Sequence, residues 1–227
     1  MKLIFLRKVP ERGNAVSFFF KPPESFTWQA GQHLHYKLPH DNPDKKGIER
    51  WFTISSAPFT REIQITTRLT DSSFKRALNN LKEGDTIEAD GPHGDFVWIT
   101  DERPKIWIAG GIGITPFHSM LMQRDNDDLP LDVTVIYANR NTEITYETQL
   151  EDLALWHDEF KLRCLIGEKL TAENVEELAP ELKNSLVYIS GPEEMVKALA
   201  GELKERLDLL DEQIKLDEFP HYTATTY

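Results

Sequence analysis

The sequence predicts a two-domain protein, in which an antiparallel Greek-key β-barrel precedes an α/β domain built on a parallel sheet. Residues 1–100 contain short segments of alternating apolar and polar residues, separated by Gly and Pro, as is typical of an antiparallel barrel. From residue 104 onward strand-like and helix-like segments alternate, which indicates a parallel sheet with right-handed crossovers. The polar stretch 101–104 is interpreted as a linker. We therefore expect domains at 1–100 and 104–227.

The composition supports a folded chain and excludes some classes of function. Of the 227 residues, 40% are hydrophobic, including 12 Phe, 5 Trp and 6 Tyr, so the chain can bury a core. The net charge of −12 argues against a nucleic-acid-binding protein. The charge is uneven, because residues 1–100 hold 14 Lys+Arg against 12 Asp+Glu and residues 101–227 hold 12 against 26. Glutamate-rich helix faces explain this asymmetry; alternatively, the first half presents the less repulsive face to an acidic partner.

The cysteine count and the chain's start bear on compartment and chemistry. The only cysteine, Cys164, excludes an internal disulfide and a cysteine-held iron–sulfur cluster, and we expect it to be a buried strand thiol. Residues 1–10 have too short an apolar stretch for a signal peptide, and nowhere do 18 apolar residues follow one another. We expect a cytoplasmic protein without a membrane span. No cluster with metal-ligand spacing is seen, so no metal site is expected.

The elements of the first domain follow from its alternating pattern. We predict one helix among the strands, opened by a serine cap at Ser72 and followed by Gly84, with Phe74 and Leu78 on its apolar face. The predicted strands lie at 15–20, 33–38, 51–54, 62–69 and 85–89, and the helix at 72–81.

The second domain is predicted to alternate strands and helices to its end. The predicted strands lie at 105–109, 131–137, 160–165 and 185–190, and the helices at 116–124, 148–156, 172–178 and 193–207. The tail 217–227 is interpreted either as a loose end or as a segment that folds back over a site through Phe219 or Tyr222.

A glycine-rich turn lies between the first strand and the first helix of this second domain. Backbone N–H groups at such a strand-to-helix turn favour a phosphate, although a tight turn without a ligand is the alternative. Ligands of parallel sheets bind beyond the carboxyl ends of the strands, where loops 138–141 and 190–195 are also expected. Because three loops converge there, phosphate binding is the favoured interpretation. The turn contains Gly110, Gly111, Gly113, Thr115 and Pro116.

The segment Arg50-Trp51-Phe52-Thr53 suits a flavin nucleotide. Arginine pairs with phosphate in bidentate fashion, an aromatic ring can lie on the flavin and a hydroxyl can bond its ring nitrogen. An edge-strand arginine beside a core phenylalanine is the alternative. Ser72 and Ser73 are interpreted as a second phosphate contact or as a plain helix cap.

Two further motifs, Gly91-Pro-His-Gly-Asp-Phe96 and Gly191-Pro-Glu-Glu-Met195, complete a resemblance. Together with the arginine segment and the glycine turn, and in the same order, they resemble the motifs of the ferredoxin–NADP reductase superfamily over nearly the whole chain. The resemblance implies FAD in the barrel, NADPH or NADH on the α/β domain, and hydride transfer from nicotinamide to flavin N5. It also implies a separate electron acceptor, such as a ferredoxin or flavodoxin-like protein, or a small acceptor.

The resemblance implies roles for individual residues. Arg50 would hold a flavin phosphate, Thr53 would bond near flavin N5, and Ser190 would lie beside the nicotinamide C4. Thr53 and Ser190 are thus the expected catalytic contacts. The remaining expected cofactor-binding residues are Trp51, Phe52, Thr67, Ser72, Ser73 and Phe74, the five residues of the glycine turn, Asn139 and Arg140, Gly191, Pro192 and Met195, and Phe219 and Tyr222.

The sequence departs from the family pattern in ways that leave alternatives open. Phe52 stands where tyrosine is usual, Ser190 where many members have cysteine, and Asp71-Ser-Ser73 where a glycine pair is common. The last change slightly weakens the prediction that the flavin is FAD rather than FMN. Arg140 can pair with the 2′-phosphate of NADPH, stack on adenine or form an ion pair with Glu143. NADPH is therefore favoured over NADH only marginally. Two other functions stay open: reduction of free flavin or a small molecule, and a non-catalytic electron-transfer subunit.

Overall fold

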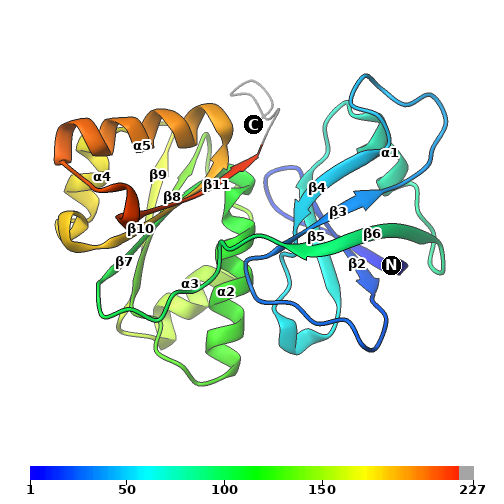
Figure 1. Cartoon of the computed structure of the whole chain (residues 1–227), viewed down its shortest axis with the longest axis horizontal. Helices are drawn as coiled ribbons and strands as arrows, with labels where there is room; N and C mark the ends of the chain where they lie inside the picture. Colours follow the sequence, from blue (N-terminus) through cyan, green and yellow to red (C-terminus); the bar gives the residue numbers. More distant parts are fainter. Residues whose placement is uncertain (220–227) are drawn as a thin grey trace.

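The computed structural model describes residues 1–219, which form two domains lying side by side (Figure 1). The first contains β1 (Lys2–Pro10), β2 (Ala15–Lys21), β3 (His33–Lys37), β4 (Glu49–Thr53), a 3₁₀ turn η1 (Pro58–Thr60), β5 (Ile63–Arg68), α1 (Ser73–Asn79) and β6 (Thr86–His93). The second contains β7 (Lys105–Gly110), η2 (Gly111–Ile114), α2 (Thr115–Asn126), β8 (Val133–Asn139), α3 (Glu147–Trp156), β9 (Phe160–Ile166), α4 (Ala172–Leu178), η3 (Leu182–Asn184), β10 (Leu186–Pro192), α5 (Glu193–Leu207), η4 (Asp211–Gln213) and β11 (Ile214–Phe219).

The first domain is an antiparallel half-barrel with strand order β4-β3-β6-β1-β2-β5, which confirms the predicted class. The sheet curls until its two edge strands meet, since the Ser55 amide after β4 donates to the Gln64 carbonyl of β5 at 2.9 Å. Its interior buries aromatic and branched side chains, including Phe18, Phe20 and Ile65.

Strand β1 was not among the predicted strands, and this is a correction. It pairs with both β2 and β6 and lies near the centre of the sheet. Leu3 and Phe5 point into the core, whereas the rest of the strand is partly or fully exposed and the register shifts between Phe5 and Arg7. Because only two inward positions are apolar, the period-two signal is too short to identify a strand.

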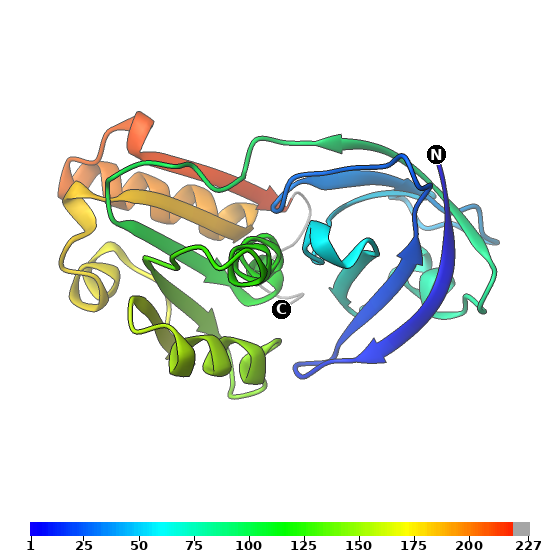
Figure 2. The same cartoon turned by 90° about the horizontal axis from the view of Figure 1, so that it is seen from below.

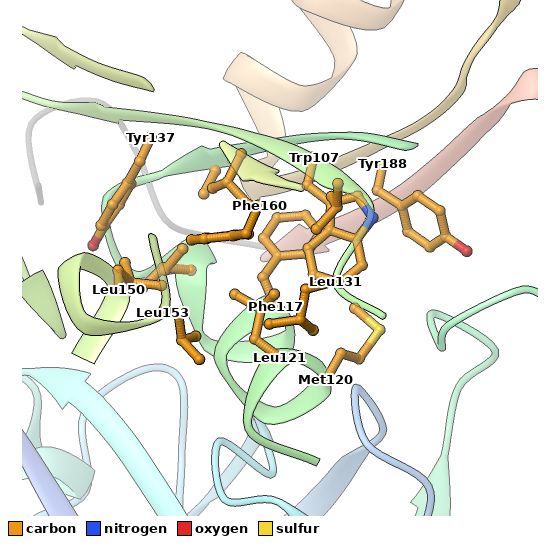
Figure 3. Packing of buried hydrophobic residues seen from close by; sticks show 14 of the residues in the cluster. Trp107, Phe117, Met120, Leu121, Leu131, Tyr137, Leu150, Leu153, Phe160 and Tyr188 are labelled. Atoms are coloured by element: carbon orange, nitrogen blue, oxygen red, sulfur yellow. The ribbon is translucent and has the colours of Figure 1, made fainter. Parts of the chain in front are cut away.

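The second domain has a five-stranded parallel sheet with strand order β11-β10-β7-β8-β9. Helices α4 and α5 cover one face, and α2 and α3 cover the other (Figures 1 and 2). Alternate residues of β7 divide between the faces, so Trp107 packs toward α2 whereas Ile106 and Ile108 pack toward α5. Figure 3 shows the hydrophobic cluster between the sheet and helices α2 and α3. In it the Trp107 and Phe117 rings stack with their centroids 4.9 Å apart.

The end of the chain differs from the prediction, because residues 214–219 form strand β11. It runs parallel to β10, with Val187 opposite Ile214 and Pro192 opposite Phe219. The predicted tail therefore begins inside a strand, while Tyr222 lies outside the described residues.

Cys164 is exposed, which corrects the expectation of a buried thiol. It does lie in a strand, but β9 is the edge of the sheet, and its residues Lys161, Arg163 and Cys164 are exposed. Among the helices of residues 1–219, none combines the length and the apolar character that crossing a bilayer requires.

Candidate active site

The glycine turn packs directly against the loop that follows β10. A Cβ atom at Gly110 would overlap the Met195 sulfur, and one at Gly113 would overlap the Ser190 carbonyl oxygen. Gly113 is therefore required by the close approach of two backbones at the carboxyl edge of the sheet, whereas at Gly110 the flexible Met195 side chain could move aside. The structure brings together there Gly110, Gly111, Gly113, Thr115, Pro116, Ser190, Gly191, Pro192 and Met195.

Asp217 lies beside Ser190, and sequence reasoning missed it. The buried Ser190 hydroxyl donates to the Asp217 carboxylate at 3.0 Å, because β11 places Asp217 opposite Ser190 in the sheet. Desolvation raises the pKa of Asp217 to about 6, although the Ser190 hydrogen bond opposes this rise. The only signal in the sequence was the alternation of 214–217, which resembles a short strand.

Replacing Asp217 by asparagine is expected to change how stability depends on pH. The folded-state pKa of Asp217 lies above its ordinary 3.8, so its stabilising contribution is complete below pH 4 and is lost as pH rises to about 6. Asparagine accepts the Ser190 hydrogen bond without titrating. The D217N variant should therefore be more stable than wild type at pH 8, and this gain should vanish near pH 4. Urea unfolding at both pH values measures it, with Glu218→Gln as the neighbouring control; an equal effect at both pH values contradicts the prediction.

The barrel places Arg50 and Phe52 on one face of β4, as alternation predicts. The Phe52 ring is buried and lies 5.8 Å from the Phe74 ring, and the Arg50 guanidinium lies 5.4 Å from the same ring. Thr53 and Thr67 are buried on β4 and β5. This side of the site therefore combines a cation with two phenyl rings.

Trp51 is not brought together with these residues. Its side chain is 49% exposed on the opposite face of β4, where the ring stacks on His35 at 4.4 Å and meets the edges of His33 and His93. A contact between Trp51 and a flavin shared with Arg50 and Phe52 is not supported by this placement.

The Arg50 guanidinium is held by a segment that sequence reasoning did not single out. Its Nη2 donates to Asp44 at 3.0 Å and lies 3.5 Å from the Ser72 hydroxyl, and the Ser73 amide donates to the same carboxylate at 2.9 Å. Burial tends to raise the pKa of Asp44, but backbone bonds from Ser73 and Lys46, the Ser73 hydroxyl and the Arg50 charge outweigh it and lower this pKa to about 2. The donor set that was predicted for phosphate therefore does bind an anion, although here it is a carboxylate of the same chain.

A buried polar network joins the two domains beside the glycine turn. His118 and Ser119 of α2 bond the carbonyl oxygens of Ser55 and Ser56 at 2.8 and 2.6 Å, and these two serines follow β4 after Ile54. The His118 ring stacks on Tyr146 at 3.8 Å, and burial lowers the pKa of His118 to about 4. The segment that follows Arg50–Thr53 and the helix that begins in the glycine turn are thus in direct contact.

Tyr146 reaches from the second domain into the barrel. Its hydroxyl bonds the Thr66 hydroxyl at 2.5 Å and accepts from Gln64 at 3.3 Å, and its backbone holds a left-handed φ of 64°. A bulky residue in that conformation is uncommon, and here it aims the ring across the domain boundary.

Tyr146→Phe should lower the free energy of unfolding by about 1–3 kcal/mol and loosen the domain contact, because the two buried hydrogen bonds of the hydroxyl to Thr66 and Gln64 are lost. Hydrogen exchange at the Ser55 amide should accelerate. Tyr137→Phe is the matched control, since the Tyr137 hydroxyl bonds the Thr145 carbonyl within one domain. Equal acceleration of exchange at Ser55 in both variants would contradict the role of the Tyr146 hydroxyl in joining the two domains.

The remaining predicted residues lie at the same edge of the sheet. Asn139, at the end of β8, is buried and accepts from the Arg68 guanidinium of the barrel at 3.4 Å, while Arg140 is exposed next to it. Phe219 is partly buried at the end of β11. Within residues 1–219, no three His, Cys, Asp or Glu side chains are grouped to hold a metal ion.

Known proteins are similar to this chain in sequence and in fold. The family described as the oxidoreductase NAD-binding domain matches residues 107–201. Flavohemoprotein A of Dictyostelium discoideum is 26% identical over 220 residues, covering 88% of this chain and 55% of the relative. Ferredoxin–NADP reductase B of Sorangium cellulosum (strain So ce56) is 27% identical over 199 residues, covering 84% and 80%. The flavohem-like FAD/NAD-binding domain of nitric oxide dioxygenase from Vibrio cholerae O1 biovar El Tor has a TM-score of 0.82 at 22% identity, covering 96% of this chain and 98% of that one.

This chain spans about half the length of the flavohemoproteins that it matches. The likeness to the Vibrio domain shows a shared two-domain fold, and the match to the NAD-binding family at 107–201 lies within the second domain. Over most of its length the chain is similar to FAD- and NAD(P)-binding reductases of the ferredoxin–NADP reductase type.

Proposed function

We propose that this chain takes a hydride from NAD(P)H onto bound FAD and passes the electrons to a separate acceptor, such as a ferredoxin or flavodoxin-like protein. One observation carries this proposal: Ser55 and Ser56, which follow the flavin motif, contact His118 and Ser119, which follow the glycine turn. The two expected binding surfaces therefore lie on either side of one domain junction. The name of the Sorangium relative, most of whose length this chain covers, supports a ferredoxin as acceptor.

The residues present fit the groups that this function needs. Arg50 and the Ser73 amide already bind a carboxylate, so their chemistry suits a flavin phosphate. The Phe52 and Phe74 rings provide an apolar surface beside that cation. Bound FAD would supply the hydride-accepting chemistry and release electrons singly or in pairs.

The protein's own contribution is to position the two rings and exclude water. Ser190 is fully buried at the carboxyl edge of the sheet, and Asp217 fixes the direction in which its hydroxyl donates. We assign Ser190 to the nicotinamide side and Thr53 to the flavin side of the transfer. Between two rings held in this way a hydride would pass directly, so no side chain needs to act as a general base.

NADPH is the co-substrate that we favour over NADH. Arg140 is exposed at the end of β8, beside the edge where Gly110 pairs with Ala138, and a cation there suits a 2′-phosphate. FAD is likewise favoured over FMN.

Reduction of free flavin is the second candidate, and one observation favours it. Arg50, the cation expected to retain the flavin phosphate, is paired with Asp44 and only 15% of its side chain is exposed. Such a site would release flavin more readily than one with an open arginine.

Flavin retention separates the two candidates. Purified protein passed through gel filtration should keep its yellow colour and release FAD on denaturation if it is an electron-carrier reductase. Loss of flavin on the column, with micromolar or weaker binding, supports the free-flavin reductase. A chain that binds no flavin at all contradicts both.

A further inference from the structure

Asp44 holds the two groups that the proposed function assigns to the flavin phosphate. Its Oδ1 lies 3.0 Å from Arg50 Nη2, and its Oδ2 accepts from the Ser73 amide at 2.9 Å. The contact is reinforced in the other direction, because the Asp44 amide donates to the Ser73 hydroxyl at 2.9 Å. A single carboxylate thus bridges β4 and the first residue of α1.

The segment around Asp44 also holds the rest of the Arg50 guanidinium. Arg50 Nη1 donates to the carbonyl oxygens of Lys46, Gly47 and Glu49, at 2.6 to 3.1 Å. The Lys46 amide in turn donates to Asp44 at 2.8 Å. The segment between β3 and β4 therefore occupies Nη1 and part of Nη2 of Arg50, the groups that a phosphate would otherwise bind.

We propose that Asp44 is an internal anion that competes with the phosphate of the flavin for Arg50 and the Ser73 amide, and thereby weakens flavin retention. The inference rests on the proposed function, since it requires a flavin phosphate at Arg50. Two anions at one guanidinium repel each other, so Asp44 opposes binding of the phosphate unless it withdraws.

The opposite role makes the opposite prediction. If Asp44 only held Arg50 in position for the ligand, removing its charge would loosen Arg50 and weaken flavin binding. As a competitor, Asp44 lowers affinity, and removing its charge strengthens binding. The direction of the change therefore distinguishes the two roles.

The test measures flavin affinity of the full chain by fluorescence titration with FAD, FMN and riboflavin. Asp44→Asn should tighten FAD and FMN binding about tenfold, the gain expected when one charge-assisted contact is released to the ligand. Riboflavin has no phosphate, so its affinity should stay within twofold of wild type. Asp41→Asn, an exposed position in the same segment, should change none of the three.

Several outcomes overturn the inference. An unchanged or weaker FAD affinity in D44N contradicts competition, and an equal gain for riboflavin shows that Asp44 does not act on the phosphate. If D44N folds poorly, Asp44→Ser replaces it, because serine keeps an oxygen without the charge. In an Arg50→Ala background the effect of D44N should shrink, because only the Ser73 amide is then left to compete for. Absence of any flavin binding in wild type and variants would instead refute the proposed function itself.

Discussion

Replacing Gly113 by alanine is expected to be among the most damaging single changes in this chain, lowering the free energy of unfolding by about 3 kcal/mol. A Cβ at this position would overlap the Ser190 carbonyl oxygen, and would lie 2.6 Å from the Ser190 carbonyl carbon and 2.8 Å from Gly191 Cα. All of these are backbone atoms of β10, so no side chain can rotate away to make room. The two loops must separate, and NAD(P)H binding should be lost with them.

Gly201→Ala is the matched control for this change. A Cβ at Gly201, inside α5, meets nothing within 4 Å, and alanine in a helix interior is worth about 0.5–1 kcal/mol over glycine. Urea unfolding of the two variants should therefore shift in opposite directions. A Gly113→Ala protein as stable as wild type, with unchanged nucleotide affinity, would contradict the packing of the two loops.

Arg50→Ala is expected to weaken FAD binding by roughly tenfold to a hundredfold. The variant loses a charge-assisted contact to phosphate, which is typically worth about 1.5–3 kcal/mol. Flavin fluorescence titration measures the change. Riboflavin binding should change far less, because that ligand has no phosphate.

Arg7→Ala provides the comparison for a surface arginine. Arg7 pairs with Glu62 at 2.7 Å, but half of its side chain is exposed, so its removal should alter stability by less than about 1 kcal/mol and leave flavin affinity unchanged. If Arg50→Ala binds FAD as tightly as Arg7→Ala does, Arg50 has no phosphate role.

Elements with strong local signals were predictable from the sequence. Helices α4 and α5 begin and end at the predicted residues, and α4 is fixed by a capping box between Thr171 and Asn174. The strand-to-helix turn at Gly110–Pro116 was equally clear. The glycines end the apolar strand pattern, and Pro116 marks the start of the helix.

Features set by distant contacts were not predictable. Strand β11 exists because β10 offers it a free edge, and its short, mixed sequence does not show this. Asp217 and Asp44 look like ordinary surface carboxylates in the sequence, and only the sheet register and the β3–β4 segment bring them to Ser190 and Arg50. Trp51 was grouped with Arg50 and Phe52 because the three residues are adjacent in one motif, whereas strand alternation places its side chain on the opposite face of β4.

The central claim is that NAD(P)H bound at the glycine turn reaches a flavin bound beside Phe52, and an anaerobic titration tests it most directly. NADPH and NADH are added in parallel to the flavin-loaded protein while its visible absorbance is recorded. We expect the flavin band to bleach with about one equivalent of reduced nicotinamide, and to bleach faster with NADPH. A flavin spectrum that neither nucleotide changes would contradict this account.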